Sequence, residues 1–292
     1  MTSDWKCYQH MMLPTCAPHE DPDLSPIEDG SVFDGNRGAV LARWTTDFDC
    51  EYETDFWYVI KDTPFDISGL KAKRRYEITK GMKNFDVRVI RAAEYAAEMA
   101  DVMEDAYASW PVQYRPPVEK ETWEKGFLQW DAALQETPSN DRETAKIYGA
   151  FDKTGKLCGF AKLGIYKDYI GFHVLRVSPS CEKAGINAAI TYAIMQDFSE
   201  LRSSGKSYIC DGTRNIYHDT NFQEYLRKYF GWRRAYCRLH IKYRWPMGIF
   251  IRLLYPFRSI FQKAKGPGYK IWALLYMEKI RRSCEQRQSA LR

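Results

Sequence analysis

The order of secondary-structure signals between residues 85 and 245 constrains the fold more than any other feature of the sequence. Hydrophobic periodicity there predicts elements in the order β-α-α-β-β-β-α-β-α-β. Strands are predicted at 87–90, 145–152, 157–166, 172–179, 207–212 and 233–245, and helices at 92–110, 120–137, 181–203 and 220–231. A simple doubly wound fold alternates one to one, whereas two helices and then three strands come in series here. The predicted fold class is α/β (α+β), with a mixed central sheet flanked by helices.

Composition excludes several classes of protein. The chain is 45% apolar and 15% aromatic, so it has enough apolar residues for a core. Its mean hydropathy is −0.52, and the sequence has no run of about 18 apolar residues that could span a bilayer. No basic start followed by an apolar run marks a secretory signal. The eight cysteines are scattered without a C-x-x-C pair, which favours free thiols over a zinc site or a disulfide scaffold. We therefore expect a cytoplasmic protein without a metal site.

Charge divides the chain into three segments. Residues 1–66 carry 4 Lys+Arg against 14 Asp+Glu, residues 67–245 carry 29 against 22, and residues 246–292 carry 10 against 2. Together with the element order, this distribution predicts three domains. They are an acidic extension at 1–84, an α/β domain at 85–245 and a basic helical tail at 246–292.

The acidic extension has weak structural signals. Residues 1–38 are rich in Pro, Asp and Gly without periodicity, so they are expected to form an extended loop or a flexible arm. The β-rich stretches 39–46 and 55–62 are expected to form a hairpin. A basic helix is predicted at 69–84, with Asp66-Ile67-Ser68 as its cap.

The junction between the strand at 172–179 and the following helix is a candidate phosphate site. A helix start presents backbone N–H groups and a favourable dipole to an anion. Gly185 would allow close backbone approach, and Lys183 supplies charge. The alternative is an ordinary helix start, which Ser180 would cap.

A polar segment at 211–221 follows a strand and opens a helix, which is where open α/β sheets bind ligands. His218 is the candidate base because imidazole titrates near neutrality. Asp211 and Tyr217 are further candidate catalytic residues, although a turn of this length is also simply polar. By strand alternation His173 is expected to be buried and satisfied, and His240 is expected on an exposed strand face.

The element order and two motifs resemble the GNAT superfamily of acyl-CoA-dependent N-acyltransferases over about residues 85–245. The family's pyrophosphate loop, (Gln/Arg)-x-x-Gly-x-(Gly/Ala), corresponds to Glu182-Lys183-Ala184-Gly185-Ile186-Asn187, which keeps the central glycine but has an acid first and Asn last. The family's second motif, a helix with an early Asn and a Gly-aromatic corner, corresponds to Asn221 and Phe230-Gly231-Trp232. Arg227 stands where the family often has a general-acid Tyr.

The resemblance implies a GNAT-like fold and acyl transfer from acetyl-CoA or another acyl-CoA to an amine. The cofactor-binding residues that it implies are Val177, Lys183, Ala184, Gly185, Ile186, Asn187 and Asn221. The expected acceptor is a small molecule or a glycan or peptide amine, for instance an amino sugar or a cell-envelope precursor.

Two alternatives remain open. Residues 71–83, KAKRRYEITKGMK, resemble the basic helix of Fem-type transferases, which implies an aminoacyl-tRNA-dependent enzyme of cell-wall synthesis. Apart from charged tRNA in that interpretation, no nucleic-acid partner is expected. The acidic loop position and the absent Tyr favour a third possibility, a GNAT-shaped binding module without catalysis.

The basic tail contains two amphipathic helices separated by Lys265-Gly266-Pro267-Gly268. Residues 247–282 carry apolar side chains at helical spacing with Arg and Lys among them, so they could lie on an anionic membrane surface. In that case the protein would be peripheral on the inner face of the membrane. The alternative is a two-helix cap docked on the domain.

Overall fold

A computed structural model describes residues 5–110, 112, 115–136, 142–203, 207–216, 221–264 and 266–290. The strands are β1 (Trp5–Tyr8), β2 (Met11–Pro14), β3 (Leu41–Thr46), β4 (Trp57–Lys61), β5 (Asp86–Ile90), β6 (Arg142–Phe151), β7 (Leu157–Tyr166), β8 (Tyr169–Val177), β9 (Tyr208–Thr213), β10 (Arg233–Tyr236) and β11 (Arg238–Tyr243). The helices are α1 (Ser25–Glu28), α2 (Ala72–Asn84), α3 (Ala96–Ala108), α4 (Lys120–Glu136), α5 (Ile186–Ser203), α6 (Phe222–Phe230), α7 (Met247–Leu254) and α8 (Pro267–Ala290), with short 3-10 turns between them.

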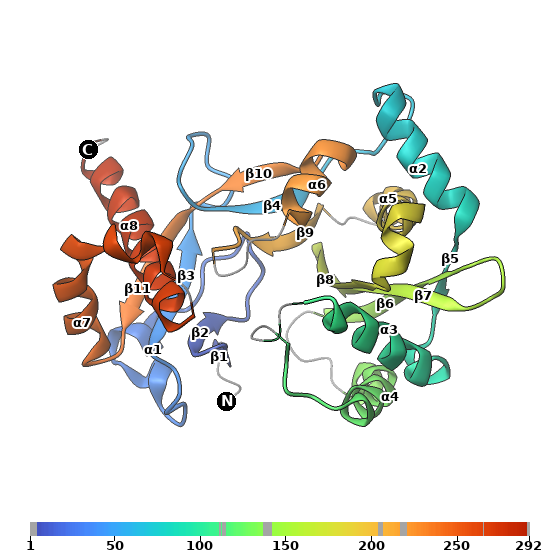
Figure 1. Cartoon of the computed structure of the whole chain (residues 1–292). Coiled ribbons are helices and arrows are strands. Elements are labelled where there is room, and N and C mark those ends of the chain that lie inside the picture. The colour runs from blue at the N-terminus through green and yellow to red at the C-terminus, as the bar shows by residue number, and fades with distance from the viewer. Residues whose placement is uncertain are drawn as a thin grey trace. The chain divides into compact units, whose positions relative to one another are not determined.

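The described strands form two sheets, in the orders β1-β2-β3-β11 and β10-β4-β9-β8-β7-β6-β5 (Figure 1). Both sheets are mixed, because β2 pairs parallel with β3 and β8 pairs parallel with β9. The predicted class, α/β (α+β) with a mixed sheet flanked by helices, is confirmed. The chain divides into two compact units, unit 1 (Met1–Val59, Thr213–Gln223, Arg233–Arg292) and unit 2 (Ile60–Gly212, Glu224–Trp232). The division into three domains, at 1–84, 85–245 and 246–292, stays a prediction.

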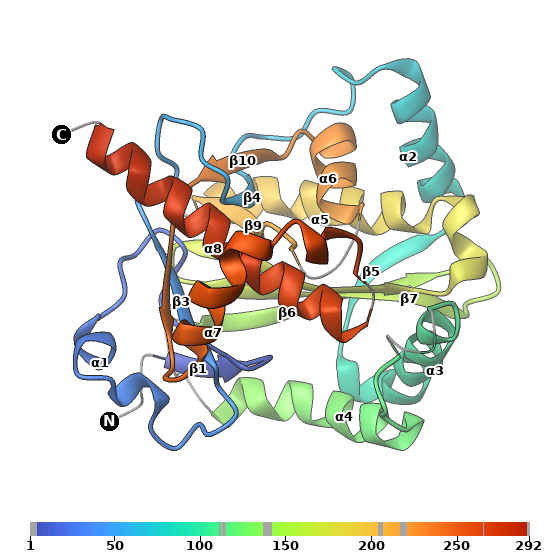
Figure 2. The ribbon, with the colours of Figure 1, turned by 60° about the vertical axis from the view of Figure 1, so that its left-hand side comes forward.

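Unit 2 contains β5 to β8 and most of β9, with helices on both faces of this part of the sheet (Figures 1 and 2). The strands predicted at 145–152 and 157–166 are present as β6 and β7, which pair antiparallel up to Phe151 and Leu157 and form a hairpin. Helices α3 and α4 cover one face and bury Met99, Val102 and Phe127 against Phe160. Helices α5 and α2 pack on the other face, where Phe198 and Ile78 are buried.

The predicted cap of the basic helix is wrong. Asp66 accepts hydrogen bonds from the backbone N–H and the hydroxyl of Ser68, at 2.8 and 2.5 Å, within its own turn. The helix begins later, after Lys71, which makes no side-chain capping bond. Asp side chains compete for nearby backbone donors in this way, so a good capping residue does not fix where a helix starts.

The prediction of an extended loop or a flexible arm at 1–38 is wrong, because this stretch forms strands and a small core in unit 1. β1 and β2 form an antiparallel hairpin, and β2 extends the sheet beside β3. The two turn residues, Gln9 and His10, both have positive φ, 47° and 64°, which is the conformation of a type I′ hairpin turn. Trp5 and Met12 are buried with Val32 and Phe33 in a small core.

Two further strand predictions are wrong in the same unit. The stretches 39–46 and 55–62 do not form a hairpin, because β3 and β4 belong to different sheets. The predicted single strand at 233–245 is two strands, β10 and β11, which belong to different sheets and are separated by Cys237 alone. Cys237 is buried; its carbonyl accepts a hydrogen bond from Thr54 Oγ1 at 2.8 Å, and its N–H donates to Phe56 O at 3.1 Å.

The basic tail divides into a docked helix and an exposed segment. Ala273, Met277 and Ile280 of α8 are buried against Leu41 and Leu239 of the four-stranded sheet, so the docking alternative holds for α8. Helix α7 and the turns after it are described below as a separate surface. Among the described residues, no helix combines the length and the apolar character that a bilayer crossing needs.

A buried ion-pair cluster fixes α8. The side chain of Glu278 is 3% exposed and accepts hydrogen bonds from Arg281, Arg282 and Tyr243 at 2.7 to 3.0 Å. Burial raises the pKa of its carboxyl, but the bonds from Arg281 and Arg282 outweigh burial and leave this pKa below the ordinary value of 4.5. A lowered folded-state pKa stabilises the fold above the unfolded pKa, and this contribution is lost as pH falls through the folded value.

We expect Glu278→Gln to lower the free energy of unfolding by about 1–3 kcal/mol at pH 7, because it leaves buried donors without a charged acceptor. The difference from wild type should shrink as pH falls below about 4.5. Urea unfolding across pH measures it. Glu285→Gln is the matched control, since Glu285 also pairs with Arg281 but its side chain is 58% exposed. Equal effects of the two substitutions would contradict the cluster's role.

Candidate functional site

The candidate site lies in unit 2, where β8 and β9 diverge. These parallel strands pair at Tyr169–Tyr208, Ile170–Ile209 and Gly171–Cys210, and the register between their described residues ends there. β8 then runs on to Val177. Diverging strand edges present backbone N–H and C=O groups to which an extended ligand can add as a strand does. The carboxyl ends of parallel strands are also where open sheets bind ligands.

A buried donor lies close to this opening. Trp232 is 4% exposed, and its ring centroid lies 6.4 Å from that of Phe172, the first residue of β8 beyond the pairing. Among the described residues, Nε1 of Trp232 has no hydrogen-bond partner. Leaving a buried N–H without an acceptor costs about 1–3 kcal/mol. A ligand that brings a carbonyl oxygen to this point would therefore be favoured.

The thiol at the opening is buried and is a poor nucleophile at neutral pH. Cys210 is the last paired residue of β9 and is buried. Burial raises the pKa of the Cys210 thiol to about 12, and its Sγ accepts a hydrogen bond from Gly212 N at 3.2 Å. Since the thiolate is the reactive form, a covalent intermediate on Cys210 is disfavoured at neutral pH.

The loop after β8 contains most of the predicted cofactor-binding residues. Val177 ends β8, and the 3-10 turn η4 (Pro179–Ala184) leads through Gly185 into α5, so that Lys183, Ala184, Gly185, Ile186 and Asn187 lie in one short stretch. The first intrahelical bond runs from Ala189 N–H to Gly185 O at 3.0 Å. Helix geometry leaves the three N–H groups before Ala189 without an intrahelical acceptor. The helix start that an anion needs is thus present.

Gly185 has a structural reason to be glycine. Its φ is +91°, and a Cβ there would lie 3.0 Å from Gly81 Cα of helix α2. In turn, a Cβ on Gly81 would meet Gly185 O. What approaches Gly185 in the structure is therefore the backbone of α2, so this glycine is no evidence for a pyrophosphate. A bulky residue at 185 would strain the fold itself.

Helix α2 also holds the loop through two side chains. Lys80 Nζ donates to Lys183 O at 2.6 Å, and Asn84 Nδ2 donates to Ala184 O at 3.0 Å. These bonds satisfy loop carbonyls and leave the loop's N–H groups to other partners. The basic helix predicted from sequence is therefore part of the structure that positions the loop.

The predicted catalytic residues are placed only in part. Asp211 is half-buried and follows Cys210, so it lies at the opening. Tyr217 and His218 lie outside the described residues. Asn221 is exposed, directly precedes α6 and belongs to unit 1. The assignment of these four residues to catalysis or cofactor binding stays a prediction.

The prediction of a buried His173 is wrong. The β7–β8 register shifts between Lys162 and Leu163, which pair with Val174 and Phe172, so His173 is the extra residue of a β-bulge. The bulge breaks the alternation on which the prediction depended, and His173 is exposed. Its ring lies over Gly164 and Gly171, where a Cβ would come within 2.5 and 2.6 Å of ring atoms.

His173 is held by an aromatic row. Tyr166 OH lies 3.1 Å from His173 Nε2, within hydrogen-bonding distance. Tyr166 stacks on Tyr169 with ring centroids 4.4 Å apart, and Tyr169 stacks on Tyr208 at 5.6 Å. The hydrogen bond limits rotation of the imidazole, so this ring is positioned two residues beyond the last β8–β9 pair.

The two titratable residues at the opening project to opposite faces of the sheet. Tyr169 and Tyr208 stack across one face, and His173 lies over Gly171 on that face. Alternation along β9 then puts Asp211 on the other face, toward α5. A single acceptor amine can therefore reach one of them directly but not both.

Local contacts describe three further side chains, of which His240 differs from the expectation. His240 is half-buried rather than exposed, because it stacks on Trp44 at 5.3 Å and lies 2.9 Å from Thr46 Oγ1; burial lowers its pKa. Arg227, at the position of the family's Tyr, pairs with Glu224 at 2.6 Å on the same helix. Tyr225 nearby has a pKa raised by burial, which makes it a poor proton donor near neutrality.

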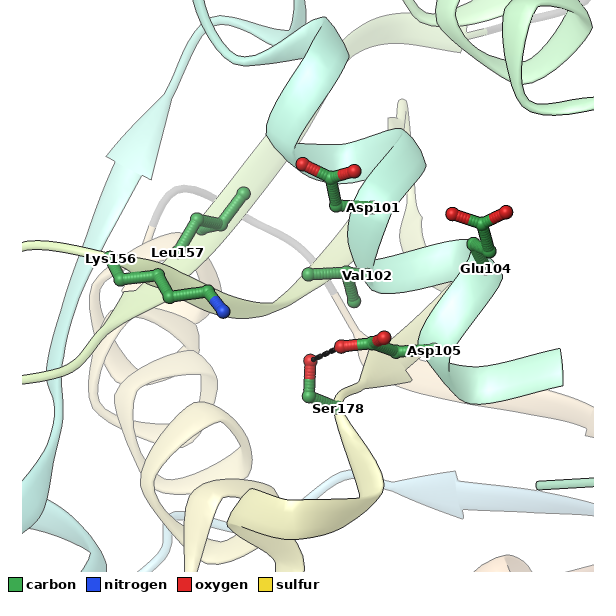
Figure 3. A pocket seen from close by; sticks show the side chains of 7 residues that line it. All are labelled: Asp101, Val102, Glu104, Asp105, Lys156, Leu157 and Ser178. Atoms are coloured by element: carbon green, nitrogen blue, oxygen red, sulfur yellow. Dashed lines mark hydrogen bonds between the residues drawn. The ribbon is translucent and has the colours of Figure 1, made fainter. Parts of the chain in front are cut away.

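A pocket on the α3 side of the same loop is acidic (Figure 3). Asp101, Glu104 and Asp105 of α3 line it with Lys156 and Ser178. Ser178 Oγ donates to Asp105 Oδ2 at 3.0 Å, and Ser178 N donates to Cys158 O at 2.8 Å. The three carboxylates would repel an anionic acyl donor. The hydrogen bonds of Ser178 in this pocket instead hold the chain in place where β8 ends.

Comparison with known proteins yields solved structures of low similarity. No protein-family profile and no curated protein matches the chain. The structure of L-PGS from Bacillus licheniformis is 16% identical, covers 89% of this chain and 86% of its own length, and has a TM-score of 0.47. A putative GNAT-family acetyltransferase from Desulfovibrio desulfuricans is 15% identical over 42% of this chain and 68% of its own, with a TM-score of 0.31.

A third similar structure is the PaiA N-acetyltransferase from Thermoplasma acidophilum in complex with coenzyme A. It is 17% identical over 39% of this chain and 74% of its own, with a TM-score of 0.29. At these identities and TM-scores, the similarities do not assign the chain to a family.

Proposed function

We propose that the protein is an N-acyltransferase whose acyl donor extends along β8 in the opening between β8 and β9. The unpartnered Nε1 of buried Trp232 beside Phe172 is the observation that supports this most directly. An extended, amide-bearing arm would satisfy that donor and the edge of β8 together. The high pKa of the Cys210 thiol favours direct transfer to the acceptor over an acyl-cysteine.

The proposed donor is an acyl-CoA. An extended arm such as that of CoA would pair with the edge of β8, and the start of α5 with exposed Lys183 suits a diphosphate. Exposed Glu182 opposes an anion there. Coenzyme A supplies an activated thioester, and the chain's own residues hold the arm, position the acceptor amine and move its proton.

His173 is the proposed base on the face away from α5. The attacking amine must lose a proton, and an exposed imidazole positioned by a tyrosine hydroxyl is suited to accept it. The backbone N–H groups of β8 near Val177 are candidates to stabilise negative charge on the acyl oxygen. Asp211 lies on the other face of the sheet, so its proposed role is to orient the acyl donor rather than the acceptor amine.

Titration of acetyl-CoA by calorimetry tests the donor site. Removing the acidic charge with Glu182→Gln should tighten binding about two- to fivefold, and Lys183→Gln should weaken it by a similar factor, since charges near a helix start are each worth about 0.3–1 kcal/mol. Both effects should shrink in high salt.

Glu121→Gln is the matched control, because Glu121 lies in the first turn of α4, away from the loop. If CoA does not bind, or if Glu182→Gln and Lys183→Gln act alike, the CoA site is refuted. CoA binding without release of free thiol in the presence of amines would instead support a binding module without catalysis.

A second candidate is transfer from an aminoacyl-tRNA. Helix α2, which holds the loop, exposes Lys73, Arg75 and Lys83, and Lys71 directly before it is exposed too, so its outer surface suits a polyanion. Charged tRNA should then bind with an affinity that falls steeply with salt, and replacing Lys73 and Lys83 by Gln should reduce the salt slope by about two. Salt-independent or undetectable tRNA binding would exclude this candidate.

A further inference from the structure

Large apolar side chains are exposed along one short stretch of unit 1. This stretch, residues 245–260, comprises α7 (Figure 2) and the turns that follow it. Its exposed apolar residues are Trp245 (81%), Ile249 (51%), Phe250 (56%), Leu253 (65%), Phe257 (56%) and Ile260 (72%). Several large apolar side chains exposed within one short segment are typical of an interaction site. We call these six residues the apolar ridge.

The ridge is exposed although its backbone is anchored. Ile251 is 3% exposed and fixes α7 against unit 1. Tyr255 lies between two guanidinium groups, with Arg282 of α8 at 3.9 Å and Arg258 at 4.5 Å from its ring centroid. Glu278, in turn, holds Arg282 at 2.7 Å. The ridge is therefore presented by a fixed segment, and a partner would not have to order it on binding.

The sequence on either side of the ridge is basic. Between Glu224 and Glu278 the sequence has no Asp or Glu and twelve Lys or Arg. Arg252 and Arg258 lie within the ridge segment and are exposed. The partner of this surface should therefore be both apolar and anionic.

We propose that the apolar ridge docks on an anionic lipid membrane, with Trp245, Phe250 and Leu253 in the interface and Arg252 and Arg258 at the headgroups. Apolar side chains interleaved with Arg, on a helix too short to span a bilayer, match the chemistry of interfacial binding. A second copy of the chain fits less well. A two-fold interface would bring Arg252 and Arg258 of both copies into one contact surface without an acidic partner in the same segment, which like-charge repulsion disfavours.

The structure narrows the membrane-binding segment relative to the sequence expectation of residues 247–282. The apolar residues of α8, among them Ala273, Met277 and Ile280, are part of the core of unit 1. They are not available to lipid. The ridge alone carries the proposal, which does not depend on the acyl donor or on any catalytic residue.

Flotation of the full chain with vesicles tests the proposal. Phosphatidylcholine vesicles with phosphatidylglycerol at about one part in three should carry the protein at low salt, whereas pure phosphatidylcholine vesicles should not. High salt should release it. The double variant Phe250→Ser, Leu253→Ser should lower the bound fraction about tenfold or more, and Arg252→Gln, Arg258→Gln should lower it and weaken the dependence on phosphatidylglycerol.

Matched controls lie in unit 2. Leu128 is 49% exposed on α4, and Arg91 is 68% exposed, so Leu128→Ser and Arg91→Gln should bind vesicles as the wild type does. Equal melting temperatures would show that the ridge variants are folded, as expected for exposed positions. The proposal is overturned if the wild type ignores anionic vesicles. It is also overturned if the ridge variants still float, or if sedimentation shows a dimer that these variants dissolve while vesicles leave the protein unbound.

Discussion

Replacing His173 by Gln is expected to lower kcat/KM for amine acylation by about 10²- to 10⁴-fold, the usual contribution of a positioned general base. CoA affinity should stay unchanged, because the imidazole lies on the face away from α5 and its loop. The rise of rate with pH that a histidine base produces should disappear. Tyr166→Phe keeps the ring stack on Tyr169 but removes the hydrogen bond to His173. We expect a smaller loss of rate there, about tenfold, with the pH dependence retained.

The control for this experiment is His240→Gln. His240 stacks on Trp44 in unit 1, and its substitution should leave the pH–rate profile as it is. An unaltered pH–rate profile for His173→Gln would show that His173 is not the general base. His218 and Asp211 would then be tested in the same assay, since both stay candidates from the sequence.

Gly81→Ala is expected to destabilise the fold by about 3 kcal/mol or more, although alanine is the better helix former. The new Cβ would collide with Gly185 O and come within 3.0 Å of Ala189 N, so backbone rather than a flexible side chain would have to move. Overpacking costs about 1–3 kcal/mol where side chains can adjust. Unfolding in urea, followed by circular dichroism, measures the difference.

Gly126→Ala is the matched control for Gly81→Ala. Gly126 lies within α4, and a Cβ there would have no neighbour within 4 Å among the described residues. Its substitution should therefore stabilise the fold by roughly 0.5–1 kcal/mol through helix propensity alone. If the two substitutions shift the urea midpoint in the same direction, helices α2 and α5 do not pack through Gly81 and Gly185.

The sequence predicts unit 2 well because its elements are long and periodic. Met99 and Val102 recur at helical spacing in α3, and the turn between β6 and β7 contains Gly155 with φ of +87°. Unit 1 fails for the opposite reason. Its strands are short, and its hairpin turn is Gln9-His10 rather than the Asn-Gly or Asp-Gly that usually signals a type I′ turn.

Strand partners in unit 1 could not be deduced either. β3 and β4 are neighbours in sequence but belong to different sheets, and β11 pairs with β3 across about 200 residues. Local patterns carry no information about such distant pairing, whereas the β6–β7 hairpin is specified by adjacent residues.

The candidate site shows the same limit at the level of single residues. The loop at 182–187 could be located because a strand leads directly into a helix there. The position of His173 could not, because one inserted residue in β8 exchanges the faces of the sheet. The sequence signal for the β-bulge was Gly171, since a glycine within a strand often marks a bulge or a close approach of another group.

Unit 1 is assembled from three separate stretches of chain, with unit 2 between them, and this has a consequence during synthesis. The sheet residues Met11 and Leu41 are made early, but Ala273 and Met277, which cover them, belong to α8. At about 5–20 residues per second, the ribosome needs roughly 10–50 s to pass from residue 59 to the end of α8. All residues of unit 2 have been made once synthesis reaches residue 232. Until α8 has been made, the early apolar strands must be shielded by their own small core around Trp5 and Phe33, or by a chaperone.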